Sequence, residues 1–338
     1  MEKSMILIEI IRRLFGSGMA LMALFIGVAP HVAAASDPSD VVVIPTQFDQ
    51  DRFFAVPTTA DGKTLRMIAD TGGGMFVFSD AAERLKLKVV GVNLDDYKGL
   101  ACTLPAFAEG KGIPTPLVLM EGGVFPVAPA PVRRNLSWFT DDIDGVLGES
   151  WFAGRVWTFD YVDRRLHLYP GGAPKPSEKA HRVDMGLRKS EFPARVPSYP
   201  RIQASIAGET LDMLLATGSS VAINAEALKE MGEGPAIRAT SLISNSVFDR
   251  WKQEHPDWRV ILNAEQDSGE PMIEVPKLTV GGFDVGPTWF TQRPDSNFRD
   301  NFSEWMDKPV EGAIGPNALR GMRVTLDYGN RVAWFEKP

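Results

Sequence analysis

The sequence has little of what most enzyme active sites and covalent cross-links require. Cys102 is the only cysteine, so no disulfide can form within the chain. The four histidines stand singly, at positions 31, 167, 181 and 255, and none has the spacing of a zinc site. The Gly-x-Ser-x-Gly motif of serine hydrolases is also missing. We therefore expect no metal and no cofactor.

The chain also has fewer basic residues than acidic ones. The chain has 36 lysine and arginine residues against 43 acidic ones, which gives a net charge of −7. Proteins that bind nucleic acids normally present a basic face, so this balance argues against a nucleic-acid partner. With 44% apolar residues and a length of 338, the chain can build the cores of two domains of ordinary size.

The first 35 residues have the pattern of a signal peptide. Basic residues, among them Arg12 and Arg13, precede an apolar run over 19–28, and small residues stand three and one places before a cut after Ala35. The arginine pair also partly matches a twin-arginine export signal. The apolar run is too short to span a bilayer comfortably. We expect a mature protein that begins near Ser36 and is exported, periplasmic or secreted, with membrane attachment only if the segment stays uncleaved.

One short motif organises the rest of the chain, the turn Asp70-Thr71-Gly72. It stands between two apolar runs, 67–69 and 75–78, that have the composition of buried strands. A second copy of the turn, Ala216-Thr217-Gly218, follows the apolar run 213–215. The second copy keeps the threonine and the glycine, but it has alanine where the first has a carboxylate.

The repeat continues beyond the two turns. Asp70 and Ala216 lie 146 residues apart, whereas two later glycines, Gly145 and Gly312, lie 167 apart. The second half therefore has 21 extra residues between its turn and its glycine. An internal repeat of this size predicts two similar β-rich halves.

A helix signal follows each turn. Asp80 and Glu83 fit a capping box for a short helix over 81–86. Asn224 fits the N-cap of a helix over 225–231. The order of elements thus recurs in the second half.

A segment rich in proline, glycine and lysine, 170–182, has the composition of a linker. It sets the predicted boundaries. We expect a signal peptide over 1–35, a first lobe over 36–169 and a second lobe over 183–338.

These residues resemble the aspartic proteases of the pepsin and retropepsin type, and most of all bacterial exported proteins with two such lobes in one chain. Besides the turns, the resemblance rests on an apolar-apolar-Gly element at 146–148 and 313–315, and on a terminal strand block at 157–161 and 324–328. It implies an all-β fold with short helices, built from two similar β-barrel lobes with a cleft between them. It also implies a peptide or protein substrate in that cleft.

In that family each lobe contributes one aspartate, and the two carboxylates share a proton because both cannot ionise so close together. Asp70 matches the first position, and the resemblance implies that it acts on a water molecule. Ala216 occupies the second position and has nothing to ionise. The residues that the resemblance places in the supporting turns are Thr71, Gly72, Ala216, Thr217 and Gly218.

Three hypotheses follow from the missing second aspartate. In the first, the chain is an aspartic endopeptidase that works through Asp70 with a non-standard second half, or through pairing between chains. Alternatively, it is a catalytically degenerate protein that binds peptides without cutting them. In the third, Ala216 is an engineered inactivation. The sequence does not distinguish the second hypothesis from the third, because a natural and an engineered alanine look the same.

Overall fold

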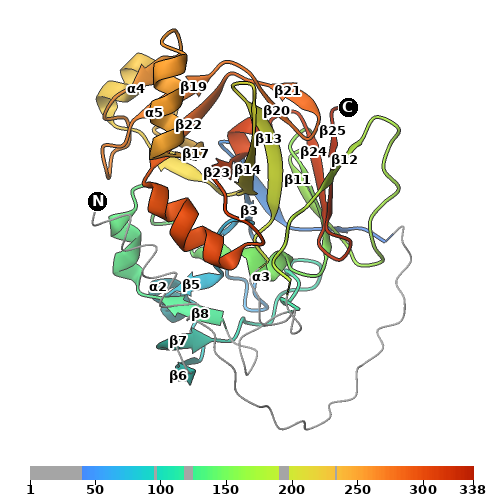
Figure 1. Cartoon of the computed structure of the whole chain (residues 1–338). Helices are drawn as coiled ribbons and strands as arrows, with labels where there is room; N and C mark the ends of the chain where they lie inside the picture. Colours follow the sequence, from blue (N-terminus) through green and yellow to red (C-terminus); the bar gives the residue numbers. More distant parts are fainter. Residues whose placement is uncertain (1–39, 95–96, 118–124, 190–197, 233) are drawn as a thin grey trace.

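The computed structural model describes residues 40–94, 97–117, 125–189, 198–232 and 234–338, so the predicted signal peptide lies outside the described residues. Strands dominate, and the helices are short (Figure 1). This confirms the predicted all-β class with short helices. Within these residues no helix is both long enough and apolar enough to cross a membrane.

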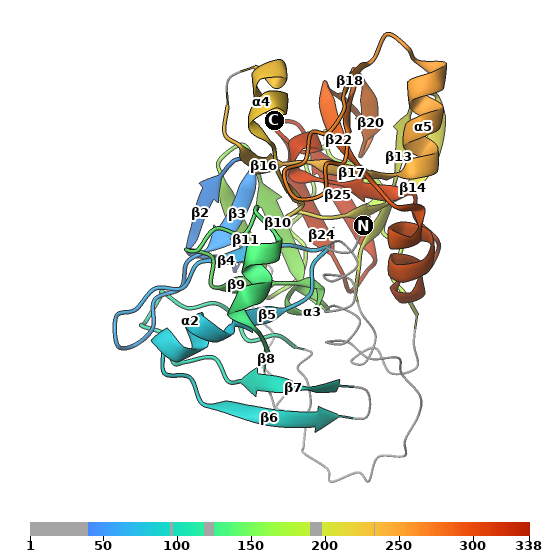
Figure 2. The same cartoon turned by 90° about the vertical axis from the view of Figure 1, so that its left-hand side faces the viewer.

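Eight strands of the first half form one sheet, in the order β2-β3-β4-β9-β5-β8-β7-β6. The hairpin of β6 and β7 projects from one end of the molecule (Figure 2). The strands are β2 (Thr46–Asp49), β3 (Arg52–Ala55), β4 (Met67–Ala69), β5 (Phe76–Phe78), β6 (Val89–Leu94), β7 (Tyr97–Cys102), β8 (Phe125–Ala128) and β9 (Gly145–Leu147). The helices of this half are α2 (Ser79–Arg84), η1 (Ala130–Asn135) and α3 (Glu149–Phe152).

Nine strands of the second half form another sheet, in the order β18-β19-β22-β17-β23-β14-β13-β20-β21. They are β13 (Arg201–Ile206), β14 (Glu209–Leu215), β17 (Ser241–Ser244), β18 (Arg259–Ile261), β19 (Met272–Val275), β20 (Leu278–Val280), β21 (Phe283–Val285), β22 (Thr288–Arg293) and β23 (Gly312–Ile314). A separate pair consists of β15 (Ser220–Ala222) and β16 (Ile237–Ala239). The helices are α4 (Ala225–Met231), α5 (Asn245–Glu254), η3 (Asn297–Phe302), η4 (Ser303–Trp305) and η5 (Pro316–Ala318).

The two sheets share one strand pattern around the turns. In the first, β4 is parallel to β9, β9 is antiparallel to β5, and β5 is parallel to β8. In the second, β14, β23, β17 and β22 have the same relations in the same order. The halves are therefore similar, as the repeat predicts.

The strand register locates the extra residues of the second half. Val77 lies opposite Gly145, and Ile243 lies opposite Gly312. Val77 and Ile243 are 166 residues apart, so 20 of the 21 extra residues lie between the Ala-Thr-Gly turn and β17. They form β15, α4 and β16. Helix α5, and not α4, therefore occupies the place of α2, which corrects the predicted order of elements.

The helix caps are predicted correctly for one helix and wrongly for the other. The Asn224 side chain accepts hydrogen bonds from the N–H groups of Glu226 and Ala227 at the start of α4. Helix α2 has no side-chain cap, so the predicted capping box is wrong. The Asp80 carboxylate instead pairs with the buried Arg133. Its Oδ1 also accepts the N–H of the adjacent Ala81 at 2.9 Å, so the carboxylate bonds inside the first turn and does not act as an N-cap.

A third sheet joins the halves, in the order β1-β11-β10-β24-β25-β12. At its centre β10 and β24 are antiparallel, and the hydroxyls of Thr158 and Thr325 are hydrogen-bonded at 2.6 Å. The strands are β1 (Val42–Val43), β10 (Val156–Asp160), β11 (Arg165–Tyr169), β12 (His181–Asp184), β24 (Arg323–Asp327) and β25 (Val332–Glu336).

The predicted closed barrels are not found among the described strands. Each strand order has two ends, and the end strands of the first and second sheets do not pair with each other. The segments that precede the strands of each half, β1 and β12, instead pair with β11 and β25 in the shared sheet. These two strands are therefore the edges of the shared sheet and do not close the sheet of their own half, while β10 and β24 join the halves.

Two glycines allow the central strands to pack closely. A Cβ atom on Gly145 would stand 2.3 Å from the carbonyl oxygen of Phe76, and one on Gly312 would stand 2.2 Å from that of Leu242. Both obstacles are backbone atoms of a paired strand, which cannot move without breaking the sheet.

We expect Gly312→Ala to lower the free energy of unfolding by about 1–3 kcal/mol, the usual cost of overpacking a rigid core. The matched control is Gly91→Ala, because a Cβ atom at Gly91 would meet nothing within 4 Å. Thermal unfolding followed by circular dichroism compares them. Equal melting temperatures for the two variants would contradict the expectation.

Candidate functional site

The two turns meet through a reciprocal set of buried hydrogen bonds. The Thr71 N–H donates to the Thr217 Oγ1 at 3.1 Å, and the Thr217 N–H donates to the Thr71 Oγ1 at 3.2 Å. Each hydroxyl in turn donates to a carbonyl of the other half: Thr71 to Leu215 at 2.5 Å, and Thr217 to Ala69 at 3.0 Å. Both threonines are fully buried. The turns therefore face each other, as the repeat predicts.

The glycines make this approach possible. A Cβ atom on Gly72 would stand 2.6 Å from the Cβ of Ala216, and one on Gly218 would stand 2.4 Å from the Cβ of Asp70. Each glycine thus leaves room for the first residue of the opposite turn. Its small size follows from contact between the halves and requires no catalytic role.

Asp70 lies half-buried at this junction. Its Oδ1 accepts hydrogen bonds from the N–H groups of Gly72 and Gly218, both at 2.9 Å. Burial raises the pKa of the carboxyl above its ordinary value, and the two N–H donors offset only part of that rise. In the described part of the chain, no hydrogen bond or ion pair involves its Oδ2.

Ala216 has an apolar environment. Only 5% of its surface is exposed, and it belongs to an apolar cluster with Tyr199, Phe298, Met306 and Val310. Phe298 comes from η3, in the orange-red helical segment of Figure 1, and the same cluster includes residues of β14 and β23. The position opposite Asp70 is therefore filled by hydrocarbon and aromatic groups.

Other acids of the turns and strand ends have structural partners. The Asp144 Oδ2 accepts the Arg66 N–H at 2.9 Å, and Glu311 accepts the Ser244 hydroxyl at 2.9 Å. Asp212 forms an ion pair with Arg201. Each fits the ordinary interpretation of a polar residue at a strand, and none supplies a partner for Asp70.

The sequence analysis missed Glu149, which is buried at the start of α3. Its backbone N–H donates to the carbonyl of Gly73 at 2.9 Å, and its Oε2 accepts the Ser198 N–H at 2.6 Å. This residue therefore links the first turn to the segment that enters β13. Burial raises the pKa of its carboxyl to about 7. The repeat contained a sign of this special position: Pro316, the equivalent residue in the second half, cannot ionise, so the carboxyl group of Glu149 is particular to the first half.

Two tyrosines belong to the same region. Burial, followed by the negative charges of Glu149 and Asp70, raises the pKa of both Tyr199 and Tyr328 well above the ordinary value. The Tyr328 hydroxyl is buried and has no hydrogen-bond partner in the described residues. Asp70 is the one carboxylate of the two turns, and the region around them adds a second carboxyl group of raised pKa, that of Glu149, and aromatic side chains.

The fold and the site define a two-part all-β protein joined by paired Thr-Gly turns, with one carboxylate at the joint. No protein-family model and no curated protein matches the chain. Solved structures that are similar to the chain include conglutin gamma, a basic 7S globulin from lupine seeds (TM-score 0.44), and basic 7S globulin from soybean (TM-score 0.46). Each is 10% identical, and the match covers 88% of this chain and 95% of the other.

These comparisons contradict the assignment to the aspartic proteases. No protease family matches, and the two similar structures are named as globulins. The prediction of a pepsin- or retropepsin-type hydrolase is therefore wrong. The paired threonines and close glycines that suggested it are explained by the way the halves join.

The turn geometry predicts the effect of removing one hydroxyl. Thr217→Val keeps the shape of the side chain but leaves the Ala69 carbonyl and the Thr71 N–H without a partner in a buried site. We expect the free energy of unfolding to fall by about 2–5 kcal/mol. Urea unfolding measures it, with Thr217→Ser expected to retain most of the stability. The exposed Thr210→Val is the matched control, and a similar loss in both valine variants would refute the assignment.

Glu149 predicts a pH dependence of stability. Its pKa is raised from 4.5 to about 7, so its stabilising contribution is complete below pH 4.5 and is lost as the pH rises through 7. We expect a loss of about 3 kcal/mol over this range, from the size of the shift.

Urea unfolding at several pH values compares the protein with Glu149→Gln, which stays neutral and can still accept the Ser198 N–H. The variant should become the more stable of the two as the pH rises. The exposed Glu254→Gln is the control. A constant difference between protein and variant from pH 5 to pH 8 would exclude a buried, proton-binding Glu149.

Proposed function

We propose that the chain is an exported binding protein that holds a peptide, or a segment of a partner protein, against Asp70 without cutting it. The observation that carries this proposal is the environment of Ala216. A single carboxylate stands at the junction, and an apolar cluster occupies the position opposite to it.

The chemistry of a lone carboxylate supports binding over hydrolysis. Hydrolysis of a peptide bond by a carboxylate pair needs one group as base toward water and a protonated group that polarises the carbonyl. Ala216 supplies no proton. Asp212 is engaged by Arg201, so it does not replace the missing group.

The acceptor geometry supports a ligand with N–H donors. The Oδ1 of Asp70 is occupied by Gly72 and Gly218, while its Oδ2 is the oxygen left to accept a further hydrogen bond. Peptide backbones carry N–H donors at nearly every residue. A half-buried carboxylate forms stronger hydrogen bonds than one in open water, because the local dielectric is lower.

The test uses the mature protein and a mixed peptide library at pH 4 to 7, with bound peptides identified by mass spectrometry. Asp70→Asn keeps an oxygen for the two glycine N–H groups but replaces Oδ2 by a donor. We expect its affinity for the selected peptides to fall about tenfold, the effect of one charge-assisted hydrogen bond.

Asp257→Asn, at an exposed position, is the control and should bind as the unmodified protein does. The selected peptides should stay intact on long incubation with all three proteins. Equal binding by the two variants would refute the role of Asp70. Cleavage that disappears in Asp70→Asn would overturn the proposal as a whole.

A further inference from the structure

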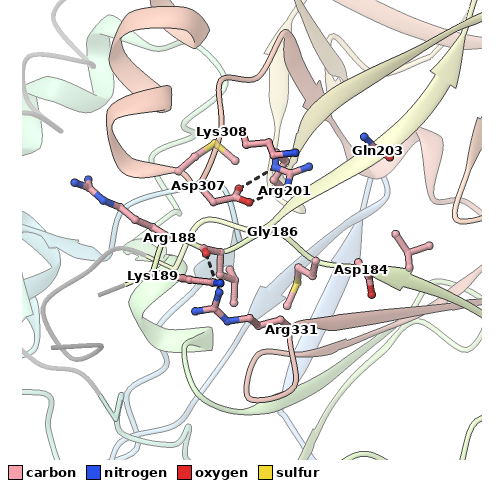
Figure 3. A pocket seen from close by; sticks show the side chains of 13 residues that line it. Asp184, Gly186, Arg188, Lys189, Arg201, Gln203, Asp307, Lys308 and Arg331 are labelled. Carbon is pink, nitrogen blue, oxygen red and sulfur yellow. Dashed lines mark hydrogen bonds and ion pairs between the residues drawn. The ribbon is translucent and has the colours of Figure 1, made fainter. Parts of the chain in front are cut away.

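A second site is a cavity of about 820 Å³ in the second half of the chain (Figure 3). It is bordered by β12 with the segment that follows it to Lys189, by the start of β13, by residues 306–308 and by Arg331. Pockets that hold small molecules usually have volumes of roughly 300–1,000 Å³. The cavity is therefore large enough for a small organic ligand. None of the residues of the paired turns lines it.

The lining is basic although the protein as a whole is acidic. Five of the lining residues are arginine or lysine, and two are aspartate. Both aspartates are paired: Asp307 with Arg201 at 2.8 Å, and Asp184 with Arg182, outside the cavity, at 2.6 Å. Four further cations line the cavity, and none has a carboxylate partner in the described residues. They are Arg188, Lys189, Lys308 and Arg331.

Backbone contacts hold two of these cations in place. Arg331 donates from Nη1 to the carbonyl of Leu187 at 3.2 Å, and Arg188 donates from Nη1 to the carbonyl of Glu304. A guanidinium has five N–H donors, so each side chain keeps others for a ligand. Because these contacts already restrict the side chains, less conformational entropy is lost when a ligand binds.

The base of the cavity is rigid. Gly186 pairs with Arg201 through two backbone hydrogen bonds of 2.8 and 2.9 Å. The Arg201–Asp307 pair packs directly over Gly186, where a Cβ atom would stand 2.5 Å from the guanidinium. Met185, Leu187 and Met306 are buried beside it. The site thus combines a fixed, partly apolar base with unpaired positive charge.

We propose that this cavity binds a small anion that carries phosphate or carboxylate groups, held by Arg188, Lys189, Lys308 and Arg331. Guanidinium groups match the planar or tetrahedral oxygens of such anions, and lysine adds charge without a fixed geometry. The partial enclosure strengthens the attraction relative to bulk water. The net charge of −7 over the whole chain does not cancel it, because exposed charges more than about 10 Å away are screened at ordinary salt.

The test is isothermal titration calorimetry on the mature protein at about 0.15 M salt, where distant exposed charges are screened, with pyrophosphate in one arm and citrate in the other. Lys189→Gln with Lys308→Gln removes two cations that make no hydrogen bond or ion pair in the described structure, so folding should be unaffected. We expect this double variant to bind at least about tenfold more weakly, from the loss of two charge-assisted contacts. Binding of either probe supports the site, and the stronger arm identifies the anionic group.

Lys175→Gln with Lys179→Gln is the matched control, since it removes the same charge from exposed positions outside the cavity. Its affinity should change less than twofold, as the same exposed charge is screened. Thermal unfolding checks that all variants are folded. Asp70→Asn should leave the affinity unchanged, so this test is independent of the peptide proposal. Equal weakening in the two lysine double variants, or no binding of either probe, would overturn the inference.

Discussion

The hydrogen bonds between Thr71 and Thr217 are the constraint on which the rest of the structure depends. Four bonds link two buried turns, and each turn ends a central strand of its half. A buried donor or acceptor left without a partner costs about 1–3 kcal/mol, so neither turn can shift alone. The close glycines and the orientation of Asp70 follow from this fixed approach. The shared sheet through β10 and β24 then joins the halves a second time.

At the joint, the residues that hold the two turns together differ from the residue that could take part in chemistry. The threonines and glycines are needed wherever two such turns meet, whether or not the residue before them can ionise. Residue types that suggest an aspartic protease are thus accounted for by hydrogen bonding and close packing. A scaffold of this kind can carry different functions, and function has to be argued from the groups at the site. Here those groups are one carboxylate and an apolar cluster.

Local patterns predicted the features that local physics determines. The internal repeat, the facing turns and the Asn224 cap each follow from residue type at a fixed spacing. The position of the extra 20 residues was not readable, because both α4 and α5 have the composition of a helix and only the pairing of β17 with β23 distinguishes them. Glu149 was not predicted because the group that donates to its carboxylate, the Ser198 N–H, lies 49 residues further along the chain. The cations of the cavity likewise come together only through the fold.

The same geometry explains why the second turn needs no carboxylate. The N–H groups of Gly72 and Gly218 both donate to a single oxygen of Asp70, so the donors of both turns are satisfied by one residue. Buried donors need partners, and a second aspartate is not required to supply them. Ala216 removes a charge from an apolar environment without leaving an N–H group unpaired. Asp70 cannot be replaced in the same way, because without its carboxylate the N–H groups of Gly72 and Gly218 would have no hydrogen-bond partner in a site of low dielectric constant. A pair of turns with aspartate in one and alanine in the other therefore leaves neither of these two N–H groups without a partner.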